Sequence, residues 1–182
     1  MEHAKAGSYP QPYPDPHPQA PEALAPPEAL NWSIDNCTVQ RALQVLGDRW
    51  SFVVLREVFN GIRRFADLRT RTAIPRQVLT DRLNLLVTEG LLRREPYREA
   101  GQRAREEYRL TAKGMDLYPV LVALNEWGST YYADPEGSPL RFVHRDCGAD
   151  VEVALRCTDG HDVERPQDVL PQPGPGAHRR TA

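Results

Sequence analysis

The sequence predicts a mainly α-helical protein with one small β-hairpin inside its main domain, a second small β-hairpin after it, and disordered tails. Three observations support this fold class: apolar residues recur at helical spacing in the middle of the chain, a glycine-containing link joins two strand-like stretches, and prolines crowd both ends. The expected division is a proline-rich disordered tail at 1–33, a helical domain at 34–133, a β-hairpin extension at 134–165 and a disordered tail at 166–182.

Two helices are expected at the start of the domain. Asp35 and Asn36 can cap a first helix in which Val39 and Leu43 share one face, and Gly47 can end it. Asp48 can cap a second helix, WSFVVLREVFNG, which has few polar positions. We therefore expect the second helix to form the buried centre of the domain.

A tight turn is expected between a short third helix and a fourth. The third helix begins at Phe65, and the break at residues 72–75 ends in Pro75, which fits only in the first turn of a new helix. The fourth helix ends at Gly90 and carries an apolar stripe of Leu79, Leu83 and Leu86. Its opposite face is polar and is formed by Gln77, Thr80, Asp81 and Asn84.

A β-hairpin and a long helix are expected to complete the domain. The strand-like stretches LLRREPYRE and REEYRLT are joined by AGQRA, which places Arg103 and Arg105 at or beside the tip. Thr111 can cap a final helix that Pro119 can bend and whose apolar stripe runs from Leu117 through Leu121 and Leu124 to Trp127. Its length indicates a dimerisation arm.

This order of elements is typical of a winged helix-turn-helix, a fold that binds DNA. A helix fits the major groove, where each base pair presents a distinct pattern of hydrogen-bond donors and acceptors. We expect Gln77 and Asn84 on the polar face to suit adenine, and Arg76 to suit guanine or a phosphate. Thr80 and Asp81 complete the face that would meet the bases.

Basic residues surround the polar helix. The net charge of the chain is −2, but residues 37–132 hold 16 Lys and Arg against 11 Asp and Glu. Arg63 and Arg64 before the helix, and Arg103 and Arg105 on the hairpin, are expected to contact DNA phosphates. The alternative is a winged helix that binds protein partners and has no affinity for DNA.

Four strings between Cys37 and about Gly128 resemble the HxlR-type, MarR-like winged helix-turn-helix regulators. They are Gly-Asp-Arg-Trp, Arg-Arg-Phe-x-x-Leu, Leu-x-x-Arg-Leu and Tyr-x-Leu-Thr-x-x-Gly. The resemblance implies a homodimer that forms through outer helices, binds double-stranded operator DNA and responds to small molecules or oxidants. Pro75 stands where the family commonly has a capping serine, and Asp48-Arg49 replaces the usual Gly-Lys, which leaves the base preference open.

Cys37 matches a cysteine that senses oxidants or electrophiles in some members of this family. That redox-sensing role needs an accessible thiolate, and a neighbouring helix N-terminus would help to stabilise one. A cysteine beside an apolar helix can equally be a small packed residue.

The extension carries two pairs of metal-ligand residues. His144 and Cys147 have H-x-x-C spacing, and Cys157 and His161 have C-x-x-x-H spacing, so the four side chains could surround a tetrahedral structural zinc. Such ribbon-like extensions resemble those of some family members. The alternative is a hairpin that merely contains these residues.

Composition also points away from several classes of protein. No apolar run approaches the length of a membrane span and no signal-peptide layout is present, so we expect a cytoplasmic protein without a membrane partner. Three cysteines do not suggest a disulfide framework. The chain has no Gly-rich phosphate loop, no Gly-x-Ser-x-Gly and no His-Glu-x-x-His, and we therefore expect no enzymatic activity.

Overall fold

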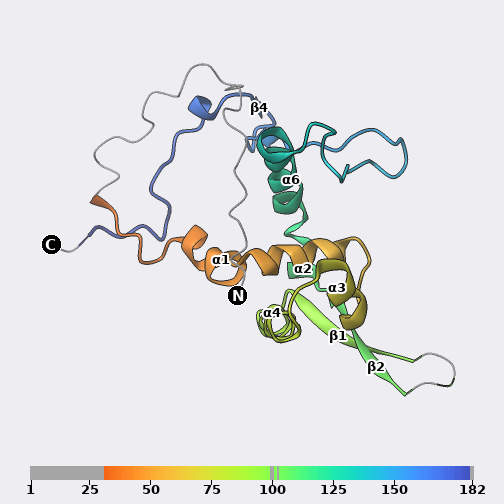
Figure 1. Ribbon diagram of the computed structural model, residues 1–182. Helices are drawn as coiled ribbons and strands as arrows, with labels where there is room; N and C mark the ends of the chain where they lie inside the picture. Colours follow the sequence, from red (N-terminus) through yellow and green to blue (C-terminus); the bar gives the residue numbers. More distant parts are fainter. Residues whose placement is uncertain (1–30, 99–100, 102, 181–182) are drawn as a thin grey trace, which may run out of the picture.

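A computed structural model of the chain describes residues 31–98, 101 and 103–180, so the predicted tail at 1–30 lies outside the described residues. The helices and strands are, in order, α1 (Thr38–Leu46), α2 (Arg49–Phe59), α3 (Phe65–Thr72), α4 (Arg76–Thr88), β1 (Leu92–Tyr97), β2 (Arg105–Leu110), α5 (Ala112–Met115), α6 (Tyr118–Tyr132), β3 (Leu155–Arg156) and β4 (Asp162–Val163) (Figure 1). A 3₁₀ helix at Pro166–Asp168 follows. This mainly helical architecture with two antiparallel hairpins confirms the predicted fold class.

The first two helices begin at different kinds of cap. The side chain of Asp48 accepts a hydrogen bond of 2.9 Å from the backbone N–H of Trp50, as the sequence predicted, because an N-cap carboxylate satisfies a free N–H of the first turn. At α1 the N-cap is Cys37, which makes no side-chain cap hydrogen bond, and the predicted cap at Asp35 or Asn36 was therefore wrong.

The core lies where α2, α3, α4 and β1 meet. It contains ten aliphatic side chains that are at most 4% exposed: Val54, Leu55, Val58, Leu68, Ile74, Leu79, Leu83, Leu86, Leu91 and Leu92. Burial of such a side chain stabilises a fold by about 1.5–3 kcal/mol. The three leucines of α4 therefore anchor its inner face and leave its outer face free for another role.

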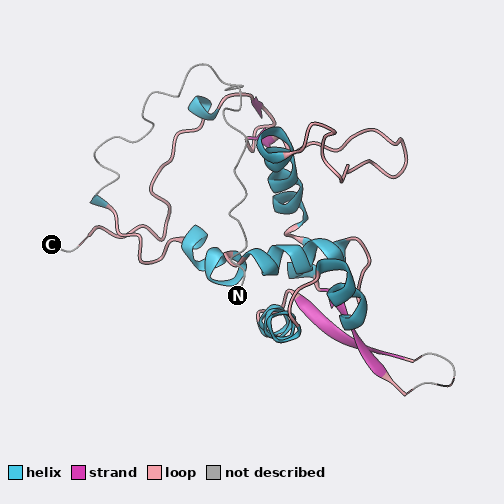
Figure 2. Ribbon diagram, in the orientation of Figure 1, coloured by secondary structure: helices cyan, strands magenta, loops and turns pink. Residues whose placement is uncertain are grey.

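The β1–β2 hairpin projects from the helices (Figure 2). Its antiparallel register runs from Leu92 opposite Leu110 to Tyr97 opposite Arg105. An isolated bridge between Arg64 and Glu107 places the segment before α3 along the outer edge of β2. The hairpin is thus fixed to the helices at its base.

The predicted long final helix is divided into α5 and α6. Thr111 does cap a helix, since its hydroxyl accepts a hydrogen bond of 3.1 Å from the Gly114 N–H, but α5 ends four residues on, at Met115. Pro119 does not bend the second helix: it lies in the first turn of α6, where its missing N–H costs no hydrogen bond. A Cβ at Gly114 would lie 2.2 Å from the Leu91 carbonyl oxygen, so this close contact requires glycine.

The residues that share a face of α6 also differ from those of the predicted apolar stripe. Leu121 and Val122 are buried against the domain, whereas Val120, Leu124 and Trp127 are 45–53% exposed. The predicted stripe from Leu117 to Trp127 therefore combined residues that face the domain with residues that face away from it.

The C-terminal part contains the predicted second hairpin. Leu155 pairs with Val163 and Arg156 with Asp162. The extension is connected to α6 by a hydrogen bond of 3.0 Å from the Val153 N–H to the Glu126 side chain. Further on, residues 178–180 lie beside residues 31–33, with a backbone hydrogen bond from Ser33 to His178 and another from Arg180 to Asn31, both 2.8 Å long.

Candidate nucleic-acid interface

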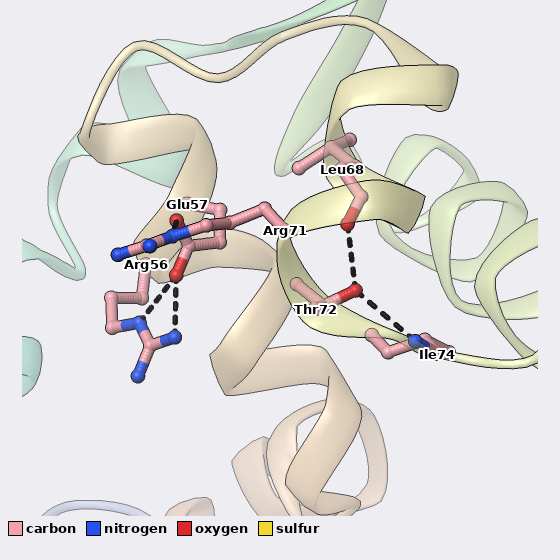
Figure 3. A network of polar contacts seen from close by, with 6 residues as sticks. All are labelled: Arg56, Glu57, Leu68, Arg71, Thr72 and Ile74. Atoms are coloured by element: carbon pink, nitrogen blue, oxygen red, sulfur yellow. Dashed lines mark hydrogen bonds and ion pairs between the residues drawn. The ribbon is translucent and has the colours of Figure 1, made fainter.

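The turn between α3 and α4 is closed by its own backbone and by Thr72. Ala73 adopts a left-handed conformation with φ of 54°, and its N–H bonds to the Arg69 carbonyl oxygen. The Thr72 hydroxyl donates to the Leu68 carbonyl oxygen at 2.7 Å and accepts from the Ile74 N–H at 3.3 Å (Figure 3). These bonds and the buried Ile74 fix the direction in which α4 leaves the turn.

A buried carboxylate lies behind this turn. The side chain of Glu57 in α2 is 1% exposed and accepts hydrogen bonds from Arg56 and from Arg71, whose Nε lies 3.4 Å from Glu57 Oε2 (Figure 3). Glu57 was not among the residues selected from the sequence. Helical spacing offered a signal, because Glu57 lies three residues after the buried Val54.

The outer face of α4 is polar, as predicted. Arg76, Gln77, Asp81 and Asn84 are exposed and Thr80 is half-buried. The Gln77 amide donates to Asp81 at 2.9 Å, and the Thr80 hydroxyl donates to the Arg76 carbonyl oxygen at 2.9 Å. Asn84 accepts from Arg94 of β1 at 2.6 Å, so the hairpin and the helix meet at this position.

A concave surface of about 620 Å³ lies over the turn. Phe65 contributes an apolar wall, Arg69 and Arg76 contribute the charge, and no acidic side chain lines it. The Arg76 guanidinium lies 6.0 Å from the centre of the Phe65 ring. The surface is therefore cationic and adjoins the first turn of α4, where free backbone N–H groups also favour an anion.

Arg63 and Arg64 point in different directions because they lie on an extended segment. The Arg64 guanidinium lies 4.4 Å from the centre of the Tyr97 ring on the hairpin. Arg63 lines a separate cavity with Arg93, Arg109 and Arg145. The structure thus does not bring these two predicted DNA contacts together at one place.

The arginines of the hairpin fall into two groups. Arg93 and Arg109 are paired with glutamates: Arg93 Nη2 lies 2.6 Å from Glu95, and Arg109 Nε lies 2.7 Å from both Glu95 and Glu107. Arg103 and Arg105 are exposed, and neither has an acidic partner within the described part of the chain. The two tip arginines are therefore the hairpin cations that are available to an external anion.

Cys37 is half-buried at the first residue before α1. Its N–H bonds to the Ile34 carbonyl oxygen at 2.9 Å, and its own carbonyl oxygen accepts from the Arg41 N–H at 3.0 Å. Its redox-sensing role stays a prediction.

The structure forms the two predicted ligand pairs but does not assemble a four-ligand zinc site. His144 Nδ1 lies 3.3 Å from Cys147 Sγ, and His161 Nδ1 lies 3.5 Å from Cys157 Sγ. Among the residues with described positions, no three His, Cys, Asp or Glu side chains gather as a metal would require. The physical reason is local: each pair closes its own turn, the first through a Gly148 to His144 backbone bond and the second through a Cys157 to His161 bond.

Comparison with known proteins gives results that agree with this geometry. The sequence model described as HxlR-like helix-turn-helix matches residues 45–136. An uncharacterized HTH-type transcriptional regulator of Mycobacterium tuberculosis is 41% identical over 153 residues, which cover 84% of this chain and 96% of that protein. One from Synechocystis is 40% identical over 98 residues, covering 52% of this chain and 70% of that protein.

Solved structures share the fold over most of the chain. PA1607, a candidate transcription factor, superposes with a TM-score of 0.67 at 35% identity over 76% of this chain and 95% of that one. PA1374 of Pseudomonas aeruginosa, also a candidate transcription factor, has a TM-score of 0.54 at 35% identity over 78% and 95% of the two chains. In the described residues, no helix combines the length and apolar character that a membrane span needs.

Proposed function

Because the chain belongs to the HxlR-like helix-turn-helix family of transcriptional regulators, we propose that it binds specific operator DNA as a cytoplasmic homodimer. The observation that carries this proposal is the outer face of α4. This outer face is polar and exposed, whereas the inner face of α4 is held in the core by three leucines that are 0% exposed. A helix held in this way can enter the major groove without loss of core packing.

Base contacts are assigned to the outer face of α4. Gln77 and Asn84 can each present both a donor and an acceptor to adenine, and Arg76 can donate two hydrogen bonds to guanine. In the free protein Gln77 and Asn84 bond to Asp81 and Arg94, so DNA binding exchanges those bonds for bonds to bases.

Phosphate contacts are assigned to the cationic surfaces on either side. The concave surface over the turn offers Arg69 and Arg76, and the hairpin tip offers Arg103 and Arg105. Such contacts position a protein on DNA and release counterions, so they weaken as salt concentration rises.

The dimer is assigned to α1 and α6. Val39 and Leu43 of α1 are 65% and 55% exposed, and Leu124 and Trp127 of α6 are 45% and 53% exposed. On each helix these residues are three or four positions apart and therefore share a face. A second copy of the chain would cover these apolar faces and present two α4 helices to one duplex.

DNA binding is tested with duplexes selected from a random pool by the full chain. We expect the selected duplex to bind more tightly than a scrambled one, with an affinity that falls as salt concentration rises. Arg103→Ala should weaken binding to both duplexes equally and reduce the salt dependence by about one counterion. Arg141→Ala, in the extension, is the matched control and should change neither value. Failure to bind any duplex would overturn the proposal and favour a protein-binding winged helix.

A further inference from the structure

A cavity of about 450 Å³ lies between the base of the hairpin, the helices and the C-terminal extension. Its walls come from the end of α2, the segment before α3, both hairpin strands, α5, the start of α6 and the loop that carries Arg145. This volume lies within the range of roughly 300–1,000 Å³ that is typical of small-molecule sites.

The charge of the cavity is positive. Four arginines line it, from four different segments, and no carboxylate does: Arg63, Arg93, Arg109 and Arg145. Glu95 and Glu107 pair with Arg93 and Arg109. The hydrogen bond to Glu107 raises the pKa of the Arg109 guanidinium above its ordinary value, although burial partly opposes this effect.

The other two arginines are not neutralised. Neither Arg63 nor Arg145 has an acidic partner among the residues whose positions are described. The backbone of Arg63 is nevertheless fixed, because its carbonyl oxygen accepts a hydrogen bond of 2.8 Å from the Tyr108 N–H. Two unpaired guanidinium groups beside one cavity favour an anion, because charge-assisted hydrogen bonds to carboxylate or phosphate are among the strongest polar contacts.

One wall of the cavity is aromatic. The Phe59 and Tyr118 rings line it, with centroids 5.1 Å apart and planes inclined by 57°. Tyr118 also contacts Phe142 of the extension, edge to face, at 5.8 Å. Ring faces beside guanidinium groups suit a ligand that has a flat apolar body as well as a negative charge.

We propose that this cavity binds a small organic anion with a flat apolar body, whose charge bridges Arg63 and Arg145 and whose body packs on Phe59 and Tyr118. The cavity adjoins both the hairpin and the segment that leads into α3. Such a ligand would contact the hairpin and the helices together and thereby change the affinity for DNA. The regulatory part rests on the proposed function; the binding part does not.

Calorimetry of the full chain tests the binding part without DNA. The probes are 1-naphthoate, 1-naphthyl phosphate and the neutral 1-naphthamide. We expect at least one anion to bind about tenfold more tightly than the amide, since each tenfold change corresponds to about 1.4 kcal/mol. Tighter binding of 1-naphthoate would identify the charged group of the ligand as a carboxylate, and tighter binding of 1-naphthyl phosphate would identify it as a phosphate. Equal affinity for all three probes, or binding of none, would overturn the proposal.

Two variants locate the ligand. Arg145→Gln should weaken binding of the anion roughly tenfold. Arg141→Gln, in the same extension but outside the cavity and paired with Asp150 at 2.8 Å, should leave it unchanged. An Arg145→Gln protein that binds the anion as tightly as the natural protein would contradict this assignment.

A DNA titration tests the regulatory part. A saturating concentration of the anion should change the affinity of the natural protein for the selected duplex, but not that of Arg145→Gln, whose ligand-free affinity should equal that of the natural protein. Unchanged affinity in the natural protein would overturn the regulatory part. If the anion binds but no duplex does, the cavity assignment stands and the proposed function fails.

Discussion

A contact between two single residues links two sequence motifs that are far apart in the chain. Asp48 lies in the string Gly-Asp-Arg-Trp and Arg82 in the string Leu-x-x-Arg-Leu, and their side chains approach to 3.5 Å. Asp48 also caps α2 through the Trp50 N–H. One carboxylate therefore both caps the central helix and forms an ion pair with the helix that we assign to base reading.

Ala73 gives a prediction at the residue scale. It is the one residue other than glycine that has a positive φ in the described part of the chain, so a β-branched side chain should be strained there. We expect Ala73→Val to reduce the free energy of unfolding by about 1 kcal/mol or more, as measured by urea denaturation. Ala66→Val, at an exposed helical position of α3, is the control and should cost only about 0.5 kcal/mol. Equal losses would contradict the argument.

Glu57 marks a limit of reading residues from sequence. Helical spacing from Val54 was a signal that its position faces the core, but its partners could not be inferred, because Arg71 lies on another helix. The same limit applies to Arg63: its neighbour Arg64 contacts the hairpin, whereas Arg63 itself lines the cavity. Side-chain direction on an extended segment depends on which elements pack around it.

At the element scale, the Glu57 contact joins α2 to α3 and gives a second prediction. Arg56 and Arg71 are 43% and 65% exposed and can return to water if Glu57 is replaced, but Glu57 cannot be hydrated if both arginines are lost. The double variant Arg56→Gln/Arg71→Gln should therefore lower the free energy of unfolding by about 3 kcal/mol, and Glu57→Gln by only about 1 kcal/mol.

Urea denaturation of both variants checks this order. Arg41→Gln, on the exposed surface of α1, is the control and should have little effect. A Glu57→Gln protein less stable than the double variant would show that shape or packing at Glu57, rather than its unpaired charge, dominates.

Elements were predictable where local rules decide them. The Asp48 cap, the α3–α4 turn and the leucine stripe of α4 follow from capping, proline geometry and helical spacing. The division between α5 and α6 was missed because Pro119 was expected to bend one long helix, whereas it lies in the first turn of a new one. The zinc site and a hairpin without metal were left as alternatives by the sequence, because spacing does not determine whether two turns lie together.

At the scale of the whole molecule, the exposed face of α6 gives a third prediction. If Leu124 lies in a dimer interface, Leu124→Glu would bury a charge there, and the dissociation constant of the dimer should rise about 100-fold or more. Sedimentation velocity measures this change. Leu155→Glu, at a 61% exposed position of the extension, is the control and should leave the dimer intact. A dimer that tolerates Leu124→Glu would exclude this face of α6 as the interface.

The whole molecule also combines two kinds of surface with separate roles. The exposed face of α4, the turn and the hairpin tip form the proposed DNA surface. The arginine cavity lies at the hairpin base, where Arg93 and Arg109 line it. The strand glutamates neutralise those two arginines and leave the tip arginines available. Charge is thus distributed so that DNA and a small anion need not compete for the same cations.

The most direct test of the central claim is the ratio of affinities for the selected and the scrambled duplex, measured for Gln77→Ala beside Thr88→Ala. Thr88 is exposed at the far end of α4 and serves as the matched control. We predict that Gln77→Ala lowers the ratio about tenfold or more, because a good bidentate base contact contributes about 1–3 kcal/mol of discrimination, and that Thr88→Ala leaves it unchanged. An unchanged ratio in Gln77→Ala would contradict base reading by this face of α4.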